Sequence, residues 1–252
     1  MAFPLRTRTR GRPGRNAGVT NVAAAPSFNP LTGWTTDPVH GVWASDPSWT
    51  PPADGGAVSS WRNGGSVGGD LVQGTGAAQP TYRASTAAFN SKPTVQFDGT
   101  DDRLLVTVTS IPQPVWLLAI GSFSAGLDSI MGYSNSSDSS FGRFDAAKWG
   151  MSSASGAFKF YANAMTPGTP YMILGYFNGT SSTFRANADT STASDAGTGA
   201  LNRFAVGGHA SSVGHWLDGH AAYASIFTTD PTALPEWAAF TAWCLTFYGI
   251  TV

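Results

Sequence analysis

Apolar residues fall in short runs along most of the chain, and Gly, Pro, Asn, Asp and Ser separate these runs. β-Branched and aromatic residues are frequent in them, which is typical of β-strands. The clearest runs are 94–97, 104–108, 115–120, 156–162, 171–177, 182–187, 204–208 and 222–227. The run 115–120 is apolar at every position, as expected of an inner strand of a sandwich. Asn178-Gly179 lies between two runs and favours a hairpin. The pattern predicts an antiparallel, all-β fold.

The hydrophobic period changes near the end of the chain. After Asp230-Pro231-Thr232, apolar side chains recur at three- and four-residue steps, at positions 234, 237, 240, 243 or 244, 247 and 248. This spacing predicts one amphipathic C-terminal helix that lies against the sheets. Thr232 is the predicted N-cap, and Glu236 in the first turn complements the helix dipole.

A short acidic turn separates the runs 94–97 and 104–108. Gly99 supplies a positive φ, and Asp98, Asp101 and Asp102 can accept hydrogen bonds from nearby backbone N–H groups. We therefore interpret 92–108 as a tight β-turn-β unit with an acidic tip. Turn capping is the first reading of the three aspartates. The second is a calcium site, because calcium prefers clustered carboxylates and carbonyls.

The same segment resembles a known family. Phe97-Asp98-Gly99-x-Asp101-Asp102-x-Leu104, preceded by Lys92-Pro93, is similar to the signature of laminin-G-like, concanavalin-A-like jelly-roll domains, which occur in secreted bacterial proteins and in phage tail and other virion proteins. Segments 41–46, 58–63, 78–82 and 217–222 resemble further strands of that family. The resemblance covers about residues 28–252 and implies a jelly-roll sandwich of two antiparallel sheets with a C-terminal helix. It does not define a function, because one sandwich fold hosts many activities.

Composition and charge narrow the setting. Charged residues are only 12% of the chain, while Gly numbers 30 and Trp 9, which favours a turn-rich extracellular or virion protein. A single cysteine, Cys244, excludes an intrachain disulfide and is expected to be a buried thiol. No run is long enough for a transmembrane helix, and the N-terminal arginines precede no apolar segment of a secretory signal. We expect assembly inside a cell and release of virions by lysis.

Residues 1–27, here called the arm, are basic and poor in apolar residues. The arm holds five arginines and no acidic residue, which leaves the rest of the chain at about −6. These arginines are Arg6, Arg8, Arg10, Arg12 and Arg15. We expect an extended anchoring arm that docks on other virion proteins by pairing arginines with carboxylates. Nucleic-acid binding is the less favoured reading, because aromatic residues do not alternate with the basic ones.

The sequence contains few of the residue patterns that enzymatic catalysis requires. Glycosidases use a pair of carboxylates, and the glucanases of this fold carry them as glutamates and aspartate on one strand; this chain has one glutamate, Glu236, in the predicted helix. His209, His215 and His220 match no zinc spacing, and no Gly-x-Ser-x-Gly nucleophile elbow occurs. We therefore predict no catalytic residues, no enzymatic activity and no cofactor, with calcium as the one candidate.

Glycan binding is the small-molecule activity that the sequence favours. Sugars stack on exposed aromatic rings near polar loops. Trp34, Trp49, Trp149 and Trp216 lie near Gly-, Pro- and Ser-rich segments. Of these we select Trp49, Trp149 and Trp216 as candidate ligand-binding residues.

The expected function combines these points. The sequence favours a phage virion protein, either a minor tail or a head-decoration protein, that oligomerises on the particle, displays a jelly roll toward host glycans and contacts no membrane. Two alternatives stay open: a polysaccharide-active, glucanase-like enzyme, and a cementing protein without a ligand.

Overall fold

The structure is a computed structural model that describes residues 28–124, 129–132, 140–145, 148–152, 159–191, 194–209 and 215–252. Side chains are described for these residues except 140, 143–145, 148–149 and 159–164. The arm therefore lies outside the described residues, as do its five arginines. Among the described residues, no helix is both long and apolar enough to cross a membrane.

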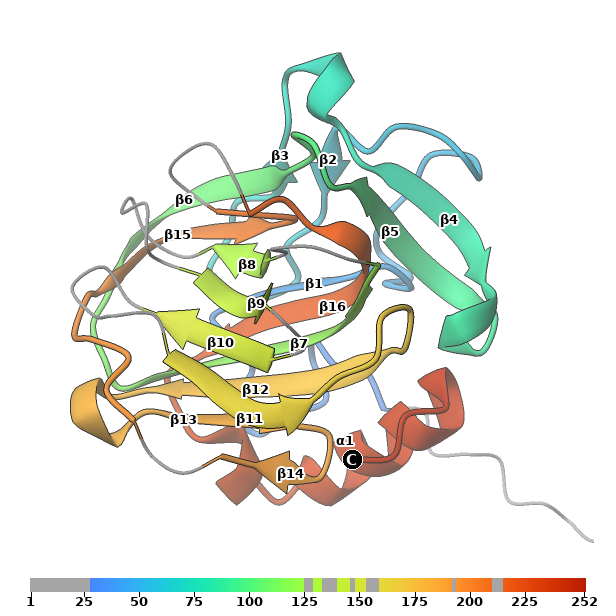
Figure 1. Ribbon diagram of the computed structural model, residues 1–252. Helices are drawn as coiled ribbons and strands as arrows, with labels where there is room; N and C mark the ends of the chain where they lie inside the picture. The colour runs from blue at the N-terminus through green and yellow to red at the C-terminus, as the bar shows by residue number, and fades with distance from the viewer. Residues whose placement is uncertain are drawn as a thin grey trace, which may run out of the picture.

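The described residues form two eight-stranded sheets, which are arranged as Figure 1 shows. Sheet I runs in the order β14 (Asp189–Thr190), β13 (Thr183–Ala186), β12 (Tyr171–Phe177), β7 (Val115–Phe123), β16 (Asp218–Phe227), β5 (Lys92–Asp98) and β4 (Thr81–Thr86), and β1 (His40–Trp43) also pairs with β16. Sheet II runs in the order β11 (Lys159–Ala164), β10 (Lys148–Ser152), β9 (Ser140–Asp145), β8 (Ser129–Gly132), β15 (Leu201–Val206), β6 (Leu104–Ile111), β3 (Leu71–Val72) and β2 (Ser60–Trp61).

All strand pairings given for the described residues are antiparallel, which confirms the predicted all-β class. The predicted hairpin is confirmed between β12 and β13, where Tyr176 faces Thr183. Its connection is longer than a two-residue turn, because Gly179–Ser181 form a 3-10 turn. The Ser182 hydroxyl stabilises that turn by donating to the carbonyl of Gly179 at 2.7 Å.

The acidic turn after β5 connects the two sheets. Asp98 pairs with Asp218 in sheet I, whereas Leu104 pairs with Val206 in sheet II. The segment is therefore not a local hairpin; it takes the chain from one layer to the other.

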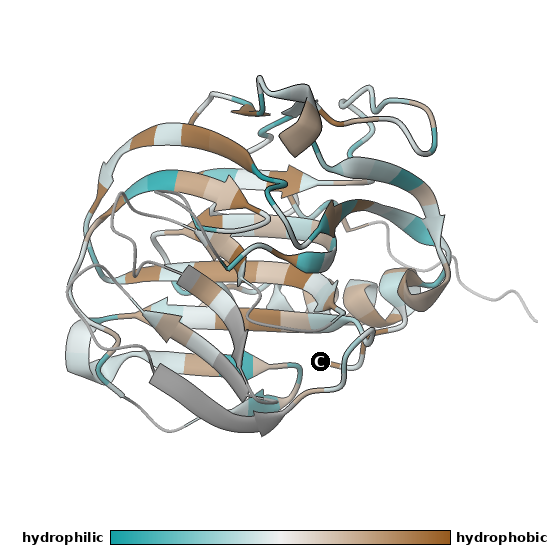
Figure 2. Cartoon of the chain, turned by 45° about the horizontal axis from the view of Figure 1, so that its top comes forward, coloured by the Kyte–Doolittle hydropathy of each residue, from teal (hydrophilic) through white to brown (hydrophobic). Residues whose placement is uncertain are grey.

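The first hydrophobic core lies between the sheets. On β7 it takes Leu117 and Ala119, and on β12 it takes Ile173 and Phe177. The second core lies on the outer face of sheet I and takes the alternate positions, such as Leu118. Alternation along a strand places successive side chains on opposite faces, so an apolar run such as 115–120 fills both cores. Figure 2 shows the resulting concentration of hydrophobic residues along the central strands.

The C-terminal helix covers the second core. The α-helix α1 (Trp237–Trp243) continues as a π-helical turn, η5 (Cys244–Tyr248). Phe240 and Trp243 are buried against the sheet, as the three- and four-residue spacing predicted. The predicted N-cap is wrong, however. Thr232 lies in a separate 3-10 turn, η4 (Pro231–Ala233), which the Asp230 side chain caps.

Residues that directly follow the arm also pack into the second core. Trp34 is buried, with its ring centroid 5.2 Å from those of both Phe28 and Phe240. The Tyr223 hydroxyl on β16 donates to the carbonyl of Pro30 at 3.0 Å. The outer face of sheet I is thus covered partly by the C-terminal helix and partly by residues 28–34.

Candidate functional site

The tryptophans selected from the sequence do not form one site. Trp49 is partly buried: its ring centroid lies 5.8 Å from that of Trp61 and 5.7 Å from that of Tyr82, so it packs against the inner core. Trp216 is also partly buried and lies under the Arg103 guanidinium, 5.5 Å from its Cζ. Trp149 is in β10, and its side chain lies outside the described part of the chain.

The three aspartates of the acidic turn are brought together. Carboxylate oxygens of Asp98, Asp101 and Asp102 lie within 4.8 Å of one another, a donor set of the kind that calcium takes. They also cap the turn as predicted: Asp98 accepts from the N–H of Thr100 at 2.8 Å, and Asp102 accepts from the N–H of Asp98 at 3.1 Å.

Burial distinguishes Asp102 from its two exposed neighbours. Its exposed fraction is 5%. Desolvation, together with the nearby charge of Asp98, raises the pKa of Asp102 to about 6. The carboxyl group of Asp102 therefore changes its protonation state near pH 6.

The histidines belong to different surroundings. The rings of His209 and His215 lie 4.8 Å apart, whereas Nδ1 of His220 lies 3.0 Å from the hydroxyl oxygen of Thr94. Burial lowers the pKa of His220. The metal-type cluster that the described residues contain is the acidic turn, and none of these histidines belongs to it.

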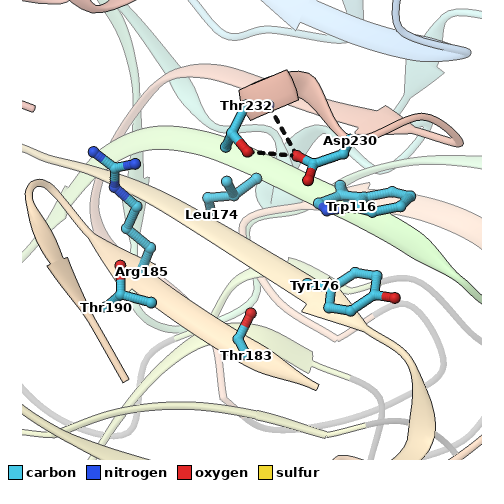
Figure 3. A pocket seen from close by; sticks show the side chains of 8 residues that line it. All are labelled: Trp116, Leu174, Tyr176, Thr183, Arg185, Thr190, Asp230 and Thr232. Atoms are coloured by element: carbon cyan, nitrogen blue, oxygen red, sulfur yellow. Dashed lines mark hydrogen bonds between the residues drawn. The ribbon is translucent and has the colours of Figure 1, made fainter. Parts of the chain in front are cut away.

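Sequence reasoning missed a cavity on the outer face of sheet I, with a volume of about 340 Å³ (Figure 3). It lies where β7, β12, β13 and β14 meet the η4 turn. The lining residues are Trp116, Leu174, Tyr176, Thr183, Arg185, Thr190, Asp230 and Thr232. We refer to it as the outer-face cavity.

Strand alternation explains how the outer-face cavity forms. Leu174 and Tyr176 on β12 point to the side opposite Ile173 and Phe177, which fill the inner core. The helix covers this face near Leu174, which belongs to the second core. Farther along β12 the η4 turn forms a wall, and the face around Tyr176 stays open.

Two aromatic rings form one side of the cavity. Trp116 and Tyr176 are direct cross-strand partners, so their side chains lie on the same face. Their ring centroids are 4.7 Å apart and their planes differ by 25°. Both residues are partly exposed. Asn178 fixes the Tyr176 hydroxyl by donating to it at 2.8 Å, so the pair is a preformed aromatic surface.

Polar groups surround these rings. Asp230 Oδ1 accepts hydrogen bonds from both the N–H and the hydroxyl of Thr232, at 2.9 and 2.8 Å. Figure 3 shows Arg185 on the side of the cavity opposite Asp230 and Trp116. Burial lowers the pKa of the Arg185 guanidinium, because desolvation penalises its charged form. Apolar rings, a carboxylate, hydroxyls and a guanidinium are the groups that saccharide sites combine.

A wider depression of about 510 Å³ lies at the same end of β12, lined by Gln113, Asn178, Thr198 and their neighbours. Gln113 holds its loops together. Its Nε2 donates to the carbonyls of Gly197 and Gly199, and its Oε1 accepts from the N–H of Gly179. Asn178, which lines this depression, donates to the hydroxyl of Tyr176, which lines the outer-face cavity.

Comparison with known proteins places the fold. No protein-family model and no curated protein matches the sequence. Among solved structures, the chain is similar to a sialidase of Trypanosoma rangeli in complex with sialic acid, with 8% identity and a TM-score of 0.51 over 82% of this chain. The same sialidase in another structure gives 9% identity, a TM-score of 0.50 and 82% coverage. The chain spans about a third, 32%, of each sialidase chain.

A carbohydrate-binding module of Bacillus subtilis, CBM66, also matches, with 12% identity over 59% of this chain and 92% of that one. Its TM-score is 0.34. The sialidase matches correct one prediction. Absence of enzymatic activity was expected from the sequence, and that expectation is contradicted, because sialidases, which are enzymes, are among the solved structures with this fold. At 8–9% identity the likeness concerns the fold alone.

Proposed function

We propose that the chain is a carbohydrate-binding β-sandwich and that the outer-face cavity is its saccharide site. The stacked, partly exposed pair of Trp116 and Tyr176 is the observation that carries the proposal. One face of a pyranose ring presents C–H groups that pack on aromatic rings, while its hydroxyls need polar partners at the edge. Asp230 and the threonines of the lining supply such partners.

The geometry favours binding without rearrangement. Trp116 lies in a central strand of sheet I and Tyr176 in its neighbour, so the backbone of both is held by the sheet. Rigid aromatic side chains lose little conformational entropy when a ligand stacks on them. The Trypanosoma rangeli sialidase, which is similar in fold, holds sialic acid in one of its structures, and this analogy supports a saccharide ligand here.

A glycan array followed by calorimetry tests the proposal. We expect Trp116→Ala to weaken binding of the selected saccharide by about tenfold or more, because a buried aromatic contact contributes roughly 1.4 kcal/mol or more to affinity. The matched control is Trp216→Ala, which removes a partly buried tryptophan outside the cavity. Equal loss in both variants, or none in Trp116→Ala, would contradict the proposal. Analysis of the bound saccharide for cleavage products then distinguishes binding from hydrolysis.

For the biological setting we propose a phage virion protein, on a tail or a head, that presents this site to a host glycan. Support comes from the laminin-G-like motifs and from the five arginines of the arm, which have no acidic residue between them. Deletion of residues 1–27 should prevent incorporation into particles while the sandwich stays folded, as measured by circular dichroism. Normal incorporation of the truncated chain would contradict this setting.

A further inference from the structure

We propose that the outer-face cavity selects a saccharide that carries a carboxylate group and that Arg185 binds this group. This inference rests on the proposed carbohydrate binding and adds the chemical class of the sugar. It starts from the position of Arg185 on β13, at the side of the cavity that faces Asp230 and Trp116 (Figure 3).

The Arg185 side chain is held in place by two contacts. Its Nε donates to the carbonyl of Asn187 at 2.6 Å, and its Cζ lies 5.4 Å from the centroid of the Trp237 ring. Neither contact uses the two terminal nitrogens. The guanidinium is thus oriented by its own chain, with its forked donor end left for another partner.

No carboxylate forms an ion pair with Arg185 within the part of the chain that the structure describes. Arg185 is nevertheless partly buried. A desolvated guanidinium is stabilised best by a carboxylate, which it binds through two parallel hydrogen bonds. A ligand carboxylate would supply the partner that the described residues do not.

Asp230 is not the carboxylate partner of Arg185. Its Oδ1 is occupied by the N–H and the hydroxyl of Thr232, and it lies beside Trp116 on the opposite side of the cavity. A carboxylate oxygen there accepts hydrogen bonds from sugar hydroxyls and repels an acid group. The two charges therefore favour one orientation of an acidic sugar: its carboxylate at Arg185, its ring over Trp116 and Tyr176, and its hydroxyls toward Asp230.

The test compares carboxylated polysaccharides with their carboxyl-reduced forms, which differ in charge but keep the ring hydroxyls. Hyaluronan, alginate, polygalacturonate and polysialic acid are the probes. We expect at least one acidic form to bind the full chain, and its reduced form to bind roughly tenfold or more weakly, because charge-assisted hydrogen bonds are lost. Arg185→Gln should abolish this preference, and Arg185→Lys should restore part of it.

A second variant keeps the test valid if Arg185→Gln does not fold. Thr190 is the direct cross-strand partner of Arg185 and is exposed. Thr190→Glu would place a carboxylate next to the guanidinium and should remove the preference for acidic forms as Arg185→Gln does. Thr190→Gln changes the same lining position without adding charge, so the ratio of acidic to reduced binding, whatever the overall affinity, should stay well above that of Thr190→Glu.

The outcomes separate this inference from the proposed function. Equal binding of acidic and reduced forms that depends on Trp116 but not on Arg185 would overturn the selection of acidic sugars and leave carbohydrate binding intact. Binding of neutral saccharides alone would do the same. Failure of every saccharide, acidic or neutral, to bind in a Trp116-dependent way would overturn both.

Discussion

The indole N–H of Trp43 donates a 2.9 Å hydrogen bond to the hydroxyl of Tyr248, 205 residues farther along the chain. Both side chains are buried in the second core. The bond joins β1, near the start of the sandwich, to the last turn of the C-terminal helix.

Tyr248→Phe should therefore destabilise the protein by about 1–3 kcal/mol, because it leaves the buried N–H of Trp43 without its acceptor. Urea unfolding followed by tryptophan fluorescence measures the loss. Tyr171→Phe is the matched control: its hydroxyl accepts from the exposed N–H of Thr166, so a change within about 0.5 kcal/mol is expected. If both substitutions change the free energy of unfolding equally, the hydrogen bond from Trp43 does not stabilise the fold more than the exposed one from Thr166.

Asp102 should make stability depend on pH. Its pKa is about 6 in the folded protein, above the ordinary value of 3.8, so the folded state binds the proton more tightly than the unfolded chain. The free energy of unfolding then decreases as the pH rises from about 4 to about 6 and stays lower above that. Asp102→Asn lacks the titrating carboxyl group, so its free energy of unfolding should rise relative to that of the parent by on the order of 2 kcal/mol between about pH 4 and about pH 6. Asp195→Asn, at an exposed turn, should leave the slope unchanged. If Asp102→Asn keeps the pH dependence of the parent's unfolding free energy, that dependence comes from another group.

Calcium titration at pH 7.5 examines the acidic turn directly. A calcium ion bound by all three carboxylates would raise the melting temperature of the parent. It would not raise that of Asp101→Asn, because this variant lacks one of the three carboxylate ligands. The turn hydrogen bonds of Asp98 and Asp102 do not use the Asp101 carboxylate, so this variant should keep the fold. Identical melting curves with and without calcium would leave turn capping as the role of the cluster.

Gly207 should be among the positions where substitution by any larger residue destabilises the fold most. Its φ is +98°, and a Cβ there would collide with the Phe97 ring and lie 2.9 Å from the carbonyl oxygen of Asp102. Gly207→Ala should cost about 3 kcal/mol or more in thermal unfolding, because buried Phe97 has no room to move. Gly168→Ala is the control that isolates the backbone cost from the steric clash. The φ of Gly168 is +76° but no atom lies within 4 Å of the added Cβ, so only the backbone cost of roughly 1–2 kcal/mol remains. Similar costs at both positions would argue against the collision.

The fold was predictable where side-chain periodicity reports burial. The apolar run 115–120 and the three- and four-residue steps from 234 to 248 identified a central strand and a packed helix. The N-cap was misplaced, because Asp230 and Thr232 are both residue types that cap helices, and the Asp230 side chain caps the separate turn η4 instead of α1. The acidic turn was recognised as a turn, but whether it joins neighbouring strands or two layers depends on distant partners, Asp218 and Val206.

The site was harder to predict than the fold. Trp116 and Tyr176 meet because β7 and β12 pair in a particular register, and register is not visible from either strand alone. Selecting tryptophans near flexible-looking loops therefore favoured Trp49, which packs on the inner core, over Trp116, which lies in an apolar strand. The available signal was Tyr176, an aromatic residue with a polar tip just before Asn178-Gly179.

The packing of residues 28–34 has a mechanical consequence. Any pull on the arm enters the sandwich through residues 28–34, where Phe28 and Trp34 pack on Phe240 of the C-terminal helix and Trp34 also packs on Phe227 of β16. Tension would peel this outer layer away first, while the facing sheets, joined by the inner core, would bear load only afterwards. A particle that holds the chain by its leading end would thus stretch the helix-covered side before the sandwich itself opens.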